Sequence, residues 1–374
     1  MTKAPVLPLT SIRFFLIAYI AIAHFIRFAT VDETILKLFS QQNLVVGAFF
    51  VLSGYIMAYV YTEFHSTEVR PIQPLKFIMN RLARMYPAYF FILLIFSPMF
   101  IYVDLYYGNG IYTLWHALVV LTLTQAWFPT LGELWNSPTW FLSASLFAYV
   151  LFPYIIAPIA KLNRKGLYKF LFTTIATSLL IKVIYSNISG WAIMEGMKLP
   201  NPAWYFNFVR FNPVINLFEF LMGIATARLM MTSESKDRSY FPGIILACLV
   251  AVMALRVPYT INDMIVRTAV FIPLFLIFLT HLHKSEGYLS KVLSHPFLVY
   301  LGEISFSIYI VHGAIGQLFY KKAVKSLFFS EPISIFIFYA SVMASAVALY
   351  HLVEKPAQNA IKKRLQIRSA PDKA

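Results

Sequence analysis

The chain has 374 residues, of which 59% are hydrophobic and 13% are charged, and its mean hydropathy is +0.69. Because a soluble domain averages about 25% charged residues, this composition excludes a soluble protein and predicts an integral membrane protein whose main partner is the lipid bilayer. The formal net charge is +15, but no basic stripe lies away from the ends of the apolar segments, so we interpret the cations as cytoplasmic topology anchors and expect no nucleic-acid partner.

Apolar segments long enough to cross a bilayer, which takes about 20 residues, recur from one end of the chain to the other. We expect each of them to form a helix, so the predicted fold class is all-α and polytopic, with about ten transmembrane helices. The predicted spans are residues 12–29, 44–62, 86–105, 140–160, 167–186, 209–230, 241–257, 264–282, 297–319 and 332–353.

An eleventh apolar segment, residues 112–128, is short and carries His116 and Gln125. The basic loops within residues 70–84 and 161–169 both belong on the cytoplasmic side, and they can share that side only if residues 112–128 do not cross fully. We therefore expect this segment to dip into the outer leaflet or to lie between helices, where irregular backbone is tolerated. In this topology both termini are cytoplasmic.

The predicted domain organisation is simple. Residues 1–356 form one transmembrane domain, and residues 357–374 form a short basic cytoplasmic tail. The single cysteine, Cys248, can form neither an internal disulfide nor a thiolate metal site. Three histidines near a predicted inner loop have no acidic or cysteine partner in the sequence, so we interpret them as loop residues and expect no metal: His281, His283 and His295.

The first predicted span carries two ionisable side chains, Arg13 and His24, with nothing charged between them. At about 3.6 residues per turn they share one helix face, and at about 1.5 Å of rise per residue they lie about 16 Å apart along the axis. Taken alone, Arg13 could be a snorkelling interfacial anchor and His24 a histidine satisfied by a neighbouring helix. Because intramembrane ionisable groups mark functional sites, the shared face favours a common tunnel.

The start of the third span carries a second pair of cations, Arg81 and Arg84. Their spacing of three residues makes both face the same side of a helix, and paired arginines suit phosphate groups through bidentate hydrogen bonds. The alternative is that they only anchor the topology. In the preceding span, Ser53 and Gly54 predict close packing between helices.

The segments that carry these residues resemble, in order, the motifs of the acyltransferase-3 family of membrane acyltransferases. Each motif is weak alone, but together they cover the chain from Leu9 to about Pro356. They read LTSIRFFLIAYIAIAHF, GAFFVLSGYIM, FIMNRLARMYPAYF, SPTWFLSASLFAYVLFP, LFEFLMGIATA, LGEISFSIYIVH and HLVEKP.

This resemblance implies transfer of an acyl group, often acetyl, from cytoplasmic acyl-CoA to a carbohydrate. Arg13 and His24 match the family's first-span arginine and tunnel histidine, and Arg81 with Arg84 matches the Arg-x-x-Arg pair associated with acyl-CoA binding. The arginines would hold the nucleotide phosphates, and the pantetheine arm would follow the face between Arg13 and His24. His24 would then act either as a general base on an acceptor hydroxyl or as a nucleophile that carries the acyl group.

The chain departs from the family pattern at two positions. Ser145 stands where the family usually has an acid, and Asn216 stands where it often has a base, for which Arg210 is the expected substitute. Three acids are candidates to replace the one missing at Ser145: Glu133, Glu195 and Glu219.

Three other polar residues lie within apolar segments. Glu219 matches a family motif, and we assign it a catalytic role in a polar cavity in preference to a structural hydrogen bond. His312 also matches the family pattern, and a cavity role and a helix-to-helix hydrogen bond are equally open for it. We interpret His116 as structural.

The resulting hypothesis is a multi-pass O-acyltransferase of a bacterial inner membrane. It takes an acyl group, by default acetyl, from acyl-CoA and passes it to a hydroxyl of an exported or lipid-linked carbohydrate such as exopolysaccharide or lipopolysaccharide. It would work directly from the membrane domain and could contact the envelope polysaccharide machinery. The rival interpretation is a proton-coupled secondary transporter of a small polar or sugar-like solute, which predicts inverted-repeat halves that the sequence does not contain.

Overall fold

The computed structural model describes residues 6–25, 32–106, 110–194, 202–232, 241–255, 262–284, 287–318 and 331–367. Throughout these residues the regular elements are helices, and the β-structure among them is one isolated bridge between Thr62 and Val69. The all-α fold class predicted from the sequence is confirmed.

The helices follow one another along the chain with short connections. The α-helices are α1 Leu7–Phe25, α2 Glu33–Phe39, α3 Gln42–Tyr61, α4 Pro74–Tyr106, α5 Thr113–Leu121, α6 Trp140–Ala160, α7 Arg164–Met194, α8 Pro202–Phe211, α9 Pro213–Met231, α10 Phe241–Ala254, α11 Asn262–Val266, α12 Ile272–Lys284, α13 Tyr288–Leu293, α14 Pro296–Glu303, α15 Ser305–Leu318, α16 Glu331–Leu349 and α17 Lys355–Ile367. Single turns of 3₁₀-helix (η2 Gly110–Tyr112, η3 Gln125–Trp127, η4 Ser137–Thr139) and of π-helix (η5 Arg267–Phe271, η7 Tyr350–Glu354) join or interrupt them.

Eight helical segments of the described chain are long and apolar enough to cross a membrane, and α14 with α15 makes a ninth if this pair, bent by 54°, is one span. The remaining predicted span, 241–257, is represented by α10, whose 14 residues are fewer than the roughly 20 that a straight crossing needs. All ten predicted apolar segments therefore contain helices, and the chain is a multi-pass membrane protein.

Residues 112–128 do not form a span, as predicted. They fold into α5, which is too short to cross, followed by the turn η3. Two tyrosines of α4 fix the end of α5, because Tyr86 and Tyr89 donate hydrogen bonds to the carbonyl oxygens of Leu121 and Val120 at 3.0 and 2.7 Å. These carbonyls belong to the last turn of α5, beyond which the helix supplies no further donors, and that of Val120 also accepts from the N–H of Leu123 at 3.0 Å.

Side chains that precede several helices determine where those helices begin. Asn212 caps α9 by accepting from the N–H of Val214 at 2.9 Å, and Pro213 occupies the first helical position, where its missing N–H costs nothing. This cap divides the predicted span 209–230 into the short helix α8 and the longer α9.

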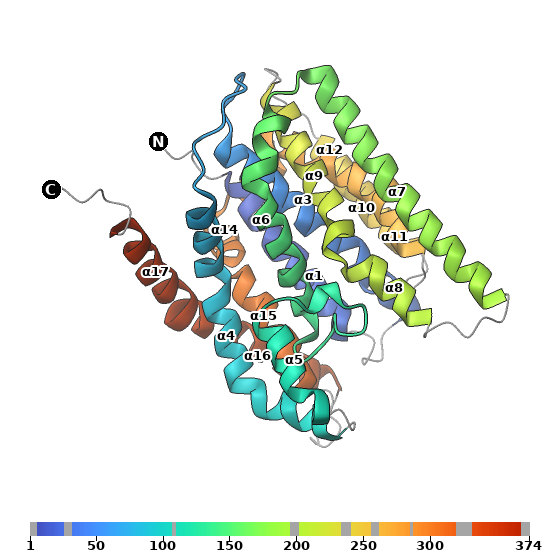
Figure 1. Cartoon of the computed structure of the whole chain (residues 1–374), viewed down its shortest axis with the longest axis vertical. Coiled ribbons are helices and arrows are strands. Elements are labelled where there is room, and N and C mark those ends of the chain that lie inside the picture. The colour runs from blue at the N-terminus through green and yellow to red at the C-terminus, as the bar shows by residue number, and fades with distance from the viewer. Residues whose placement is uncertain are drawn as a thin grey trace.

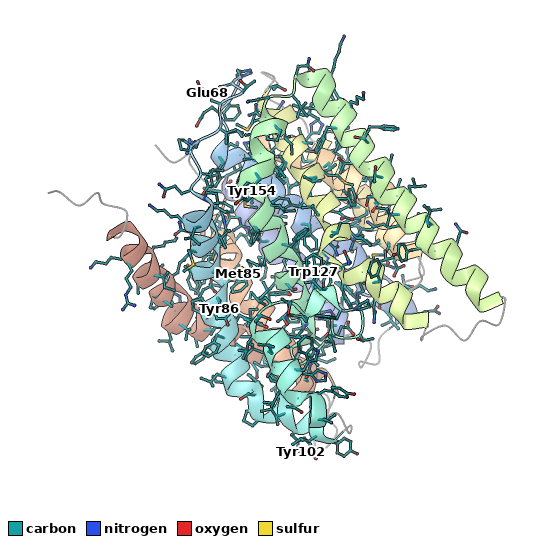
Figure 2. All side chains as sticks on the ribbon, in the orientation of Figure 1. Glu68, Met85, Tyr86, Tyr102, Trp127 and Tyr154 are labelled. Atoms are coloured by element: carbon teal, nitrogen blue, oxygen red, sulfur yellow. The ribbon has the colours of Figure 1, made fainter. Side chains whose placement is uncertain are left out.

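Helix α3 lies near the centre of the bundle (Figure 1). In Figure 1, α7 runs along one side of the bundle and α17 lies beside α4 on the other. Figure 2 shows Glu68, in the segment that precedes α4, near one end of the long axis, and Tyr102, near the last turn of α4, at the other end. The predicted domain boundary at residue 356 falls inside α17.

Helices α3 and α9 cross at close range, and two glycines make this crossing possible. A Cβ atom at Gly54 would lie 2.0 Å from the carbonyl oxygen of Phe220, and one at Gly223 would lie 2.1 Å from that of Val51. The two backbones are thus in direct contact, as the pairing of Ser53 with Gly54 predicts. This contact fixes the face of α3 that is turned toward α1.

We expect Gly54→Ala to destabilise the protein by at least about 1–3 kcal/mol, because the added methyl group overlaps backbone atoms that cannot move aside. The measurement is the thermal unfolding midpoint in detergent. The matched control is Gly243→Ala on α10, where a Cβ meets nothing within 4 Å and the substitution should be neutral or slightly stabilising. Equal midpoints for the two variants would contradict this account of the crossing.

Candidate active site

A cavity that encloses about 160 Å³ lies between α1, α3, α4, α6 and α15. From α1 it is lined by Arg13, Ile17, Ile20 and His24, a spacing of four, three and four residues that keeps all of them on one helix face. The predicted common face of Arg13 and His24 is therefore present, and it faces the interior of the bundle rather than lipid.

The opposite wall comes from α3, which runs in the reverse direction to α1. It contributes Gln42, Phe49, Ser53 and Met57, among others. The hydroxyl of Tyr19 in α1 donates to the carbonyl oxygen of Leu38 at 2.5 Å and accepts from the N–H of Gln41 at 3.0 Å, which holds the start of α3 beside the second half of α1. Met57 consequently lies toward Arg13, and Gln42 toward His24.

Three arginines surround one end of the cavity, which we call the arginine end: Arg13 of α1 with Arg81 and Arg84 of α4. Among the described residues, no carboxylate lies within ion-pair distance of any of them. Arg81 instead lies over the rings of Phe77 and Tyr149, with its guanidinium carbon 5.1 and 6.0 Å from their centroids. Three close cations that form no ion pair within the described part of the chain make this end of the cavity positive, which favours a polyanion.

His24 lines the opposite, histidine end of the cavity, and a second imidazole, that of His312, stacks on it from behind the cavity wall. His24 Nδ1 lies 3.0 Å from His312 Nε2, and the rings are nearly parallel, at 10° with centroids 5.2 Å apart. His312 is fully buried, and its Nδ1 lies 2.7 Å from the backbone carbonyl oxygen of Tyr309. Of the two roles that the sequence leaves open for His312, the structure shows the helix-to-helix hydrogen bond, and the partner in that bond, His24, lines the cavity.

The cavity wall also contains polar atoms that no described residue satisfies. Ser145, at the position where the family has an acid, lines the cavity with a buried hydroxyl that has no hydrogen-bond partner in the described part of the chain. Arg210 also lines the cavity, and its Nη1 donates to Glu133 at 2.9 Å. Of the acids proposed to replace the one missing at Ser145, Glu133 does not line the cavity but binds Arg210, which does. Glu195 lies outside the described residues.

Glu219, which the sequence suggested for catalysis, does not line the cavity. It is fully buried between α7 and η5, where Lys182 donates to its Oε1 at 2.7 Å and Arg267 donates to the same oxygen at 3.0 Å. The position therefore gives no support to a catalytic role. An ion cluster of one carboxylate and two cations, all buried, instead joins three helical segments in the membrane interior.

The same cluster also places a cation beside Asn216, the position where the family often has a basic residue. Asn216 accepts a hydrogen bond from Arg267 Nη2 at 3.0 Å, so the cation beside it is Arg267 and not Arg210. Lys182 and Arg267 are not among the site residues predicted from the sequence, although each is a cation inside a predicted span, and that property marks a functional or structural site.

Three of the other histidines have partners away from the cavity. His116 Nδ1 lies 3.0 Å from Asp104 Oδ2, which also accepts from the indole N–H of Trp135, so it ties α5 to α4. His283 hydrogen-bonds to the Tyr55 hydroxyl at 2.9 Å, and His295 caps α14.

Fold and cavity together define a multi-pass membrane protein with an internal cavity that has arginines at one end and, at the other, His24 with His312 stacked behind it. The sequence model of the acyltransferase domain that defines the acyltransferase-3 family matches residues 9–351, and the chain belongs to that family. It is 25% identical over 371 residues, which cover 95% of this chain and 91% of the relative, to a protein named Acyltransferase MdmB from Streptomyces mycarofaciens. No solved structure gives a significant match. The resemblance read from the sequence is confirmed, and the protein is a membrane acyltransferase.

We expect Glu219→Gln to lower stability by about 3–5 kcal/mol, because it leaves two buried cations without a carboxylate. The measurement is the unfolding midpoint in detergent. The control is Glu33→Gln, which removes the exposed ion pair to Lys37 and should cost no more than about 0.5 kcal/mol. A Glu219→Gln protein that unfolds like the wild type but has lost its turnover would return Glu219 to catalysis.

Proposed function

We propose that the protein transfers an acyl group from acyl-CoA to a hydroxyl group of an exported or lipid-linked carbohydrate. The observation that carries this proposal is that Arg13, Arg81, Arg84 and His24 line one continuous cavity. A thioester donor with a polyphosphate head and a narrow arm fits this arrangement, because the cations lie at one end and the basic nitrogen at the other.

The arginine end is suited to the diphosphate of coenzyme A. Guanidinium groups form bidentate, charge-assisted hydrogen bonds with phosphate oxygens, and Arg81 and Arg84 lie on one face of α4 beside Arg13. The distance of about 16 Å along α1 from Arg13 to His24 is the length that the pantetheine arm would cover to bring the thioester to the imidazole.

The histidine end is suited to acyl transfer. In the proposed step His24 takes the proton of the acceptor hydroxyl. The hydroxyl oxygen forms a new C–O bond to the acyl carbon, the C–S bond breaks, and the proton passes from His24 to the departing CoA thiolate. The unsatisfied Ser145 hydroxyl and Arg210 provide polar groups on the cavity wall that an oxygen-rich acceptor could use.

We also propose which end of the cavity faces which side of the membrane. The arginine end faces the cytoplasm, where acyl-CoA is made, and both termini lie on that side of a bacterial inner membrane. The default acyl group is acetyl, and candidate acceptors are exopolysaccharide, lipopolysaccharide or a similar glycan. Mass spectrometry of surface glycans with and without the gene would report the acyl mass and the acceptor together.

The test of the activity is release of CoA thiol by the purified protein in proteoliposomes supplied with acetyl-CoA. We expect thiol release that increases when an acceptor is present. Solute transport without any CoA release would instead favour the proton-coupled transporter.

We expect His24→Ala to lower acyl transfer by at least about 100-fold, the range that loss of a general base produces, while the protein still inserts and unfolds at a similar temperature. The measurement is CoA release under saturating donor. The control is His351→Gln, an exposed histidine that hydrogen-bonds to Tyr300 away from the cavity. Retained transfer in His24→Ala would end the catalytic assignment.

We expect the double substitution Arg81→Ala with Arg84→Ala to weaken acyl-CoA binding by at least about tenfold, since each charge-assisted hydrogen bond contributes about 1.5–3 kcal/mol. Calorimetry with a non-hydrolysable acyl-CoA measures the affinity. Arg164→Ala with Lys165→Ala, which removes two exposed cations at the start of α7, is the control for net charge. Unchanged affinity in the double variant would make Arg81 and Arg84 topology anchors only.

A further inference from the structure

His312 does not line the cavity, yet it contacts the residue proposed to carry the chemistry. It is 0% exposed, and both of its ring nitrogens have partners that the structure identifies. The Nδ1 atom lies 2.7 Å from the backbone carbonyl oxygen of Tyr309, and Nε2 lies 3.0 Å from Nδ1 of His24.

The nature of these partners determines where the protons are. A carbonyl oxygen can only accept a hydrogen bond, so Nδ1 of His312 must carry a proton and donate it. With a neutral ring, Nε2 of His312 is then unprotonated and accepts. The contact at 3.0 Å is a hydrogen bond only if Nδ1 of His24 donates, which leaves the lone pair of a neutral His24 on its Nε2.

The helix that carries His312 is fixed at this depth by contacts with the segment before α6. The Tyr309 hydroxyl donates to the carbonyl oxygen of Pro138, and Asn136 Nδ2 donates to that of Ile310 at 3.0 Å. Gly313 lies against the same segment, where a Cβ would come 2.5 Å from Asn136 Oδ1. His312 therefore cannot turn or slide without breaking several buried contacts.

We propose that His312 is a positioning residue that holds His24 in the Nδ1-protonated tautomer, so that Nε2 of His24 is the atom that takes the proton of the acceptor hydroxyl. The inference rests on the proposed function for its chemical meaning, but the proton positions follow from the two partners of His312 when both rings are neutral. When His24 becomes an imidazolium, its Nδ1–H still donates to His312, and this bond strengthens because the donor is charged. A neutral imidazole provides this support without placing a second charge in the membrane interior.

The direct test is nitrogen-15 NMR of histidine-labelled protein in lipid at about pH 8, above the ordinary histidine pKa of about 6.5. Comparison with His24→Asn assigns the two signals of His24. We expect a protonated Nδ1 and an unprotonated Nε2 in the wild type and in His312→Gln, whose amide oxygen can accept in place of Nε2. In His312→Leu, we expect the opposite tautomer or a mixture.

Kinetics provide the second test. Glutamine can place an acceptor near the position of Nε2, whereas asparagine reaches only that of Nδ1. We therefore expect His312→Asn and His312→Leu to lower kcat by about 100-fold, with the KM for acyl-CoA changed by less than about threefold, and His312→Gln to restore kcat to within about tenfold of the wild type. His295→Asn, an exposed histidine whose helix cap asparagine preserves, should behave like the wild type.

Either of two results would overturn the proposal: a wild-type His24 protonated on Nε2, or equal kcat values for the asparagine and glutamine variants when both are folded. If the substitutions at His312 prevent folding, the wild-type spectrum still decides. The spectrum also separates this inference from the proposed function, because it needs no reaction. If the wild type shows the expected tautomer but His24→Ala remains active, His312 still orients His24, and His24 is not the catalytic base.

Discussion

The interior of a bilayer does not solvate charge, and this constraint organises the whole molecule. A cation in a span must face a wet cavity, meet a counterion or reach the interface. Arg13, Arg81 and Arg84 satisfy it by lining a cavity, and Lys182 and Arg267 satisfy it by sharing the Glu219 carboxylate. Two solutions to the same problem thus coexist a few helices apart. The cavity arginines leave their positive charge accessible to a ligand, whereas the charges of Lys182 and Arg267 are buried against Glu219.

The sequence predicts what depends on a single helix. Apolar runs locate the spans, and the spacing of Arg13 and His24 on one face needs nothing beyond helical periodicity. The break at α5 is also predictable, since the loops on either side of it carry the same charge bias. The first two predictions need only the sequence of one helix, and the third needs the two basic loops within residues 70–84 and 161–169.

Contacts between distant helices are not predictable in this way. Glu219 is 37 residues from Lys182 and 48 from Arg267, and no periodicity indicates that they meet. The same holds for His24 and His312, which are separated by 288 residues. From the sequence alone, an intramembrane acid such as Glu219 is interpreted as functional. Its ion pairs with Lys182 and Arg267 show that it joins helices instead of lining the cavity. The departures at Ser145 and Asn216 likewise become interpretable only when the residues around them are known.

The buried ion cluster has a consequence for how the chain enters the membrane. A lone lysine or carboxylate at the centre of an inserting helix costs about 2.5–3.5 kcal/mol, and α7 and α9 each carry one. Inserted as a hairpin, the two can neutralise each other at once through the 2.7 Å contact, well before Arg267 is synthesised. Helices α7 and α9 would then enter the lipid together as a pair. The segment that carries Arg267 would pack later against the Lys182–Glu219 ion pair that has already formed.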